Sequence, residues 1–249
     1  MKLILPAISF LASMASADLL SLVKSLESQV QNSTAAGMQF RNFDNIWDGL
    51  AGILATMTEQ ITASGDYGCW CYFASNNGYV GNGYGGALDN YDRACKTLHD
   101  NYACMELDDA TCDPFTVSYN VPAAWIGSIP TMVDFEPSCT AENPGNVCGA
   151  NACVAESAFV KSYLEEKDSL NSEYQHSNAN FDVTTSCNLG NSFTSWTANR
   201  GEKACCGSYP NRQIFYNGNK LCCNGLYVYN TVTKQCCADS QIRNVGDTC

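Results

Sequence analysis

The chain contains two histidines, and one of them, His99, stands directly before an acidic residue, Asp100, in the stretch DNYDRACKTLHDNYAC (89–104). A histidine can act as a general base, and a neighbouring carboxylate can bind a cation or orient the ring. The pair is therefore a candidate catalytic site. It is equally compatible with polar surface on a helix that disulfides hold in place. The choice depends on the elements that position the two side chains.

Two long helices are expected to carry these residues. The first is predicted to begin at Leu88-Asp89, where the Asp89 side chain can cap it. The second is predicted over CGANACVAESAFVKSYLEE (148–166), with Glu156 near its middle. Residues 107–147 contain five prolines and are predicted to form a loop. The apolar side chains of the first helix recur at spacings of three and four, which predicts one buried face: Tyr91, Cys95, Leu98, Tyr102 and Met105.

The beginning of the chain has the features of a secretory signal. A positive charge at Lys2 precedes the apolar run LILPAISFLA, and the small residues Ala15-Ser16-Ala17 follow, which predicts a signal peptide over 1–17. The run is too short to span a bilayer. Sixteen cysteines, an even number, favour disulfides in an exported chain. The protein is therefore expected to be secreted and extracellular.

The net charge of the chain limits the classes of partner that it is expected to bind. The formal net charge is −12, and the 13 Lys and Arg residues are scattered rather than gathered in a stripe. Nucleic acid is therefore not an expected partner. The same charge disfavours strong attraction to an anionic membrane surface.

The predicted fold class is mainly α and disulfide-rich, in two parts. After the signal, apolar stripes over 19–30 and 43–57 predict two amphipathic helices, so that the helical domain covers 18–165. A linker is predicted over 166–186, and a small module with cysteine doublets over 187–249. Eight cysteines fall in each half, so each half could close four bridges by itself. The spacing does not give the connectivity.

The ordered set YGCWC (67–71), a glycine-rich loop, LDNYDRAC (88–95) and His99-Asp100 resembles secreted phospholipase A2. The resemblance implies a helical domain with two long helices joined by disulfides. It also implies calcium-dependent hydrolysis of a phospholipid acyl ester, with a membrane or micelle surface as partner. In that family a histidine activates water, a second acid orients the histidine, and Ca²⁺ polarises the ester carbonyl. The implied roles are His99 as base, Glu156 as orienting acid, and Asp100 with Trp70, Tyr72 and Gly83 as calcium ligands.

Three departures keep a second hypothesis open. Tyr72 stands where the family has a glycine. Aligning LDNYDRAC without a gap puts Leu98 at the position of the base and His99 at the position of the calcium aspartate. In the second helix the family's acid directly follows a cysteine, whereas Val154 follows Cys153 here, and solvated surface is the favoured interpretation of Glu156 two residues further on. The alternative is therefore a weak or inactive relative that binds or builds extracellular matrix, because the doublets and CCGSYPN (205–211) weakly resemble the di-cysteine repeats of galaxin-like matrix proteins.

Overall fold

The structure, a computed structural model, describes residues 66–72, 83, 85–120, 122, 134–166, 168–187 and 201–249. The predicted signal peptide and the two amphipathic stripes over 19–30 and 43–57 lie outside the described residues. All sixteen cysteines lie within them and form eight disulfides. The described chain is therefore a disulfide-rich protein with helices and small strand pairs.

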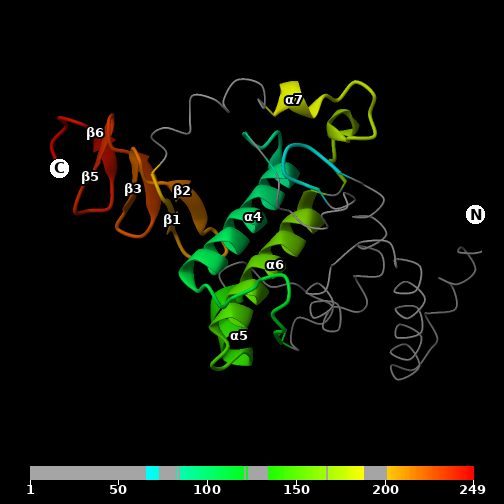
Figure 1. Ribbon diagram of the computed structural model, residues 1–249, viewed down its shortest axis with the longest axis horizontal. Coiled ribbons are helices and arrows are strands. Elements are labelled where there is room, and N and C mark those ends of the chain that lie inside the picture. The colour runs from blue at the N-terminus through cyan, green and yellow to red at the C-terminus, as the bar shows by residue number, and fades with distance from the viewer. Residues whose placement is uncertain are drawn as a thin grey trace, which may run out of the picture.

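Two long helices, α4 (Asn90–Asp108) and α6 (Val147–Glu166), lie side by side (Figure 1). The Asp89 side chain accepts a hydrogen bond from the Asp92 backbone N–H, which confirms the predicted N-cap. The predicted stripe of α4 is confirmed as a buried face, because Tyr91, Cys95, Leu98, Tyr102 and Met105 are all at most 6% exposed. This face packs against α6, where Phe159, Val160 and Tyr163 are buried in the same core.

A short helix, α5 (Phe135–Glu142), interrupts the segment that was predicted to be a loop. The prediction was wrong here because Pro137 suggested a break, whereas a proline is tolerated in the first turn of a helix. Phe135 and Cys139 are buried, and the disulfide Cys139–Cys153 joins α5 to α6. The bridge Cys112–Cys148 ties the connection after α4 to the beginning of α6.

The segment after α6 turns back to the YGCWC loop. It contains a 3-10 turn, η3 (Ser172–Tyr174), and one turn of helix, α7 (Val183–Ser186). Tyr67 forms an isolated antiparallel bridge with Gln175, and Cys187 is bonded to Cys69. The stretch predicted as a linker is thus packed against the helical part by its described residues.

Three antiparallel hairpins follow in a row from α4 towards the C-terminus (Figure 1). Each hairpin is a separate two-stranded sheet that contains cysteines of the doublets. Its short strands agree with the turn-rich sequence of this region. The pairs are β1 (Lys203–Cys206) with β2 (Gln213–Tyr216), β3 (Lys220–Cys223) with β4 (Tyr227–Asn230), and β5 (Lys234–Cys236) with β6 (Ile242–Asn244).

Two disulfides cross the boundary between the two groups of eight cysteines. Cys69 pairs with Cys187, and Cys104 of α4 pairs with Cys205 of β1. The halves therefore do not close their bridges separately. A further contact holds the first hairpin on α4, because Arg212 forms an ion pair with Asp108 at 2.7 Å.

Candidate functional site

The YGCWC loop is anchored to α4 by one buried carboxylate, that of Asp92. Its oxygens accept hydrogen bonds from the backbone N–H groups of Cys69, Trp70 and Leu88 at 2.7 to 3.0 Å. Burial raises the pKa of Asp92, and the N–H donors act in the opposite direction. Gly68 has a φ of +59°, and a Cβ there would lie 2.5 Å from the Asp92 carboxyl carbon. The glycine of the loop is therefore required both by conformation and by space.

Two disulfides and a histidine complete the support of this loop. Cys71–Cys95 joins it to α4, and Cys69–Cys187 joins it to the returning segment. The Nε2 atom of His176 lies 2.7 Å from the carbonyl oxygen of Gly68. The predicted interpretation of His176 as a loop residue is confirmed, and its ring supports the YGCWC backbone.

His99 lies on the side of α4 that faces Trp70. The two ring centroids are 5.2 Å apart. The Lys96 ammonium lies over the same Trp70 ring, 4.9 Å from its centroid. Since Lys96 is three residues before His99, both side chains occupy neighbouring positions on one helix surface. Trp70 is thus covered by two side chains that can carry positive charge.

Asp100 is buried and is engaged by a cation of the chain itself. Its Oδ2 atom lies 2.5 Å from the Nζ atom of Lys96, one turn earlier on α4. Burial raises the pKa of Asp100, while the charges of Lys96 and His99 act to lower it. The interpretation of Asp100 as ordinary exposed helix surface is therefore wrong, because only 5% of the residue is exposed.

Glu156 is fully buried, so the interpretation of Glu156 as solvated surface is also wrong. Its Oε1 accepts a hydrogen bond from the Tyr102 hydroxyl at 2.7 Å, and its Oε2 accepts one from the Tyr119 hydroxyl at 2.6 Å. Burial raises the pKa of Glu156 to about 7, and the two hydroxyls oppose that rise. The pKa values of both tyrosines are raised by burial and by the carboxylate.

The candidate residues consequently form two groups. Leu98 and His99 precede Tyr102 on α4 by four and three residues, and as successive residues their side chains point about 100° apart around the helix. Leu98 is 1% exposed and packs in the core. His99 influences the pKa of Asp100, whereas the pKa of Glu156 depends on burial and the two tyrosines. The predicted base and the predicted orienting acid thus belong to different groups.

The residues expected to bind calcium are engaged in other contacts. A Cβ on Gly83 would lie 2.3 Å from the Trp70 ring, so Gly83 packs directly on that ring. The Tyr72 ring contacts His176, with centroids 5.2 Å apart. Two loop carbonyls, those of Gly68 and Cys71, are hydrogen-bonded to His176 and to the Tyr67 N–H.

Asp100, the carboxylate predicted to bind calcium, is paired with a cation of the chain itself. Calcium binds several oxygen ligands, among them carboxylates, backbone carbonyls and water. The Lys96 ammonium lies on the Asp100 carboxylate and would have to be displaced before this carboxylate could hold calcium. Among the described residues, no three His, Cys, Asp or Glu side chains gather as a metal-binding group.

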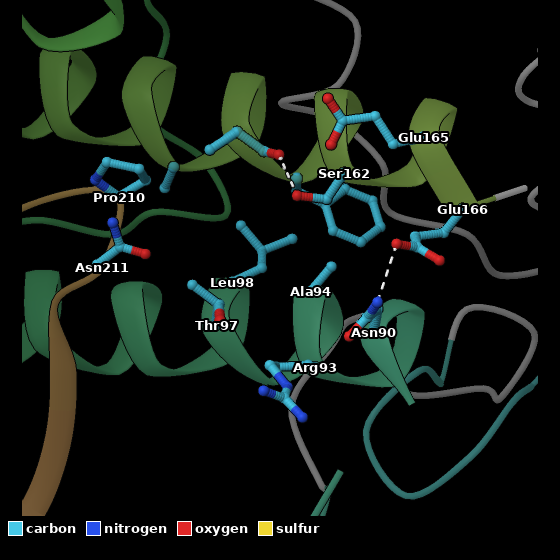
Figure 2. A pocket seen from close by; sticks show the side chains of 13 residues that line it. Asn90, Arg93, Ala94, Thr97, Leu98, Ser162, Glu165, Glu166, Pro210 and Asn211 are labelled. Carbon is cyan, nitrogen blue, oxygen red and sulfur yellow. Dashed lines mark hydrogen bonds between the residues drawn. The ribbon is translucent and has the colours of Figure 1, made fainter. Parts of the chain in front are cut away.

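A small cleft lies between α4 and α6, with a volume of about 170 Å³ (Figure 2). Small apolar side chains of both helices form its floor, and the hydrogen bond between Asn90 and Glu166 crosses one end. Pro210 and Asn211, in the turn between β1 and β2, line the other end. His99 is not among its lining residues.

Sequence reasoning did not identify Tyr119 or the anchoring role of Asp92. Tyr119 lies in a predicted loop and has no periodic neighbour to indicate that it is buried. Asp92 was recognised only as an acidic residue of the first turn. Its position three residues after the cap and three residues before Cys95 is the signal that could have suggested a closer role.

No family model matches the chain, and comparisons with curated proteins and with solved structures also find no match. In the part of the chain that the structure describes, no helix has the length and hydrophobicity needed to cross a membrane.

Proposed function

We propose that the protein is a secreted, non-catalytic component of an extracellular layer, built on a helical domain that is similar to phospholipase A2. The observation that carries this proposal is the environment of Glu156. Both of its carboxylate oxygens accept hydrogen bonds from tyrosine hydroxyls, and the buried Leu98 stands four residues before Tyr102 on α4. The side chain four residues before Tyr102 is therefore that of a leucine, which cannot take up a proton.

The chemistry of a general base supports this proposal. A base must reach the proton that it removes, and in a histidine site a carboxylate commonly orients the ring. Here each oxygen of the buried carboxylate accepts a hydrogen bond from a tyrosine, Tyr102 or Tyr119, and His99 packs on Trp70. The polar groups therefore serve to fix the helices and the loop.

The cysteines support an extracellular location. All sixteen are paired, and such a density of disulfides is typical of oxidising compartments. The signal-like sequence at 1–17 agrees with export. A protein that is covalently fixed at eight places suits a durable structural or binding role outside the cell.

An assay of lipid hydrolysis tests the proposal. Purified mature protein and its His99→Gln variant would be incubated with micelles of a zwitterionic phospholipid, with Ca²⁺ or with a chelator. We expect fatty-acid release at background in all four samples, alongside an active secreted phospholipase as assay control. Calcium-dependent release that disappears in His99→Gln would overturn the proposal and establish the enzyme.

A second candidate, hydrolysis of a phospholipid acyl ester, is favoured by the pKa of Glu156. A buried carboxyl with a pKa of about 7 suits proton transfer near neutral pH. For this function, the His99 ring has to be within hydrogen-bond reach of the water that it activates and be oriented by Glu156. Calorimetry adds an independent measurement: calcium heat that is lost in Asp100→Asn would support the enzyme, and equal heat in both proteins would support the non-catalytic role.

A further inference from the structure

The three C-terminal hairpins are repeats of one unit. Each first strand starts with a lysine and carries a cysteine two residues later, as in Lys203-Ala204-Cys205. Lys203, Lys220 and Lys234 pair with Tyr216, Asn230 and Asn244 at the open ends of the hairpins. The array is thus a linear series of similar units, each in contact with its neighbours.

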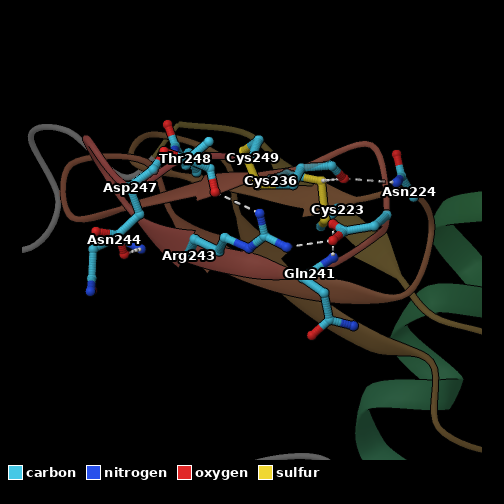
Figure 3. Close-up of a disulfide and its surroundings, with 12 residues drawn as sticks. Cys223, Asn224, Cys236, Gln241, Arg243, Asn244, Asp247, Thr248 and Cys249 are labelled. Atoms are coloured by element: carbon cyan, nitrogen blue, oxygen red, sulfur yellow. Dashed lines mark hydrogen bonds and ion pairs between the residues drawn. A yellow bond between two sulfur atoms is a disulfide. The ribbon is translucent and has the colours of Figure 1, made fainter.

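The bridges of this array connect each unit to the next. In every doublet the first cysteine bonds to a partner earlier in the chain, and the second bonds to a partner later in the chain. Figure 3 shows one such link, Cys223–Cys236, and the hydrogen bond that Arg243 donates to the Thr248 carbonyl. Arg243 also forms an ion pair with Asp239. The order of bridges is Cys104–Cys205, Cys206–Cys222, Cys223–Cys236 and Cys237–Cys249.

The array has almost no core apart from these bridges. Among residues 201–249 the buried side chains are Cys206, Phe215, Cys223 and Cys237. An isolated two-stranded hairpin is at best marginally stable in water. The disulfides therefore hold the three hairpins together.

The connectivity creates a short covalent path from α4 to the C-terminus. The path runs through four disulfides, and one peptide linkage within each doublet joins one disulfide to the next. The Cα atoms of these bridges are 5.3 to 5.8 Å apart, and adjacent residues add about 3.8 Å each. The whole path from Cys104 to Cys249 is therefore only about 33 Å long. The strands and turns of the hairpins lie in closed loops beside it.

We propose that this array is a mechanical tie, which transmits tension between the helical part and Cys249 without being extended. Force applied at its ends passes along the bridges and the doublet peptide bonds. It does not pass through the hydrogen bonds of the hairpins, so no hairpin has to unfold under load. This function goes beyond the proposed function, because it follows from connectivity and holds whether or not the helices bind or hydrolyse lipid.

Single-molecule force spectroscopy tests the tie on the full mature chain. One handle would be coupled, by chemistry that spares cysteine, to a reactive residue replacing the exposed Glu106, two positions after Cys104. The other handle would follow Cys249. We expect the distance between the handles of the oxidised protein to stay within about 40 Å, because two residue steps separate residue 106 from Cys104. After full reduction, the 143 residue steps from residue 106 to Cys249 should extend to roughly 500 Å.

Variants that each lack one disulfide show which bridges belong to the covalent path. Cys206→Ser with Cys222→Ser should add about 50 Å of extension, because 16 residue steps enter the path. Cys237→Ser with Cys249→Ser should add somewhat less, because 12 steps enter. Cys112→Ser with Cys148→Ser removes a bridge that lies off the path and should add nothing between these handles.

Three results would overturn the tie. The first is an extension of hundreds of ångströms in a protein whose intact mass shows sixteen oxidised cysteines. The second is an unchanged extension in both on-path variants. The third is an equal gain in the off-path variant. Because lipid hydrolysis is not measured, none of these results depends on the outcome of the lipid assay.

Discussion

At Glu156 a buried acid is held by two phenols in the middle of the helix pair. Burial favours the neutral carboxyl and raises its pKa to about 7, although the hydroxyls of Tyr102 and Tyr119 stabilise the anion. A carboxyl whose pKa is raised in the folded state holds its proton longer than it does in the unfolded chain. The free energy of unfolding is therefore expected to fall as the pH rises through the range in which Glu156 is deprotonated in the unfolded chain but still protonated in the folded protein.

Replacing Glu156 by glutamine should reveal this dependence. Between about pH 4.5 and 7 the unfolded chain releases the proton and the folded chain keeps it, so the free energy of unfolding of the native protein should fall as pH rises. In Glu156→Gln that decline should be smaller by roughly 1 to 3 kcal/mol. Guanidinium unfolding with intact disulfides, repeated across this pH range, measures the difference.

Glu165→Gln is the matched control, because this carboxyl is on the same helix and 56% of its side chain is exposed in an ion pair with Lys161. Its pH profile should follow that of the native protein. If Glu156→Gln and the native protein show parallel profiles, the raised pKa of Glu156 is wrong.

The environments of single side chains could be predicted from the sequence only in part. The stripe from Tyr91 to Met105 was predictable, since its period alone determines the buried face. The environment of His99 was not, because a shift of one residue turns a side chain by about 100° and nothing in the local sequence fixes the register against Trp70. Glu156 was misjudged because its partners, Tyr102 and Tyr119, come from distant parts of the chain.

At the scale of elements, the loop before α4 depends on a close approach of its backbone to Trp70. Gly83→Ala would place a Cβ 2.3 Å from that ring and 2.6 Å from the Cys69 carbonyl oxygen. Since Trp70 is buried, it has little room to move. We expect a loss of roughly 1 to 3 kcal/mol in the free energy of unfolding, as for other overpacked sites, measured by denaturant titration.

Gly86→Ala provides the comparison within the same loop. A Cβ on Gly86 would meet nothing within 4 Å, so this variant should unfold within about 0.5 kcal/mol of the native protein. Equal losses in both variants would mean that the contact with Trp70 does not account for the effect.

Elements with a strong period were predictable, and those fixed by long-range bonds were not. The helices α4 and α6 follow from their periodic apolar residues, and the hairpins from short strands separated by turn residues. The helix α5 was missed because its eight residues carry only two buried positions, Phe135 and Cys139. A disulfide to α6 supplies the remaining support, and spacing does not reveal such a pairing.

On the scale of the whole molecule, one bridge attaches the hairpin array to the helical part. Cys104–Cys205 closes a long loop, with a sequence separation of 101 residues, and the ion pair of Arg212 with Asp108 lies beside it. A bridge across a long loop removes much conformational freedom from the open state. The position of β1 and β2 on α4 should therefore depend mainly on this bridge.

Removing that bridge in Cys104→Ala with Cys205→Ala should loosen the first hairpin. We expect amide hydrogens of β1 and β2 to exchange at least tenfold faster, while those of α6 keep their native rates. Hydrogen exchange resolved by mass spectrometry measures both in one experiment. In Cys237→Ala with Cys249→Ala, which opens only the last 12-residue interval, β1 and β2 should remain protected. Unchanged exchange rates of β1 and β2 in the first variant would show that noncovalent contacts are enough to hold this hairpin on α4.

The two disulfides that join distant parts of the chain also determine when each bridge can form during synthesis. A ribosome delivers Cys69 and Cys104 more than a hundred residues before their partners, Cys187 and Cys205, exist. In the tail, by contrast, each of the last three bridges closes within 16 residues. These two early thiols must therefore be kept from the wrong partner until residues 187 and 205 have been synthesised, after which the last three bridges can form one after another in the order of translation.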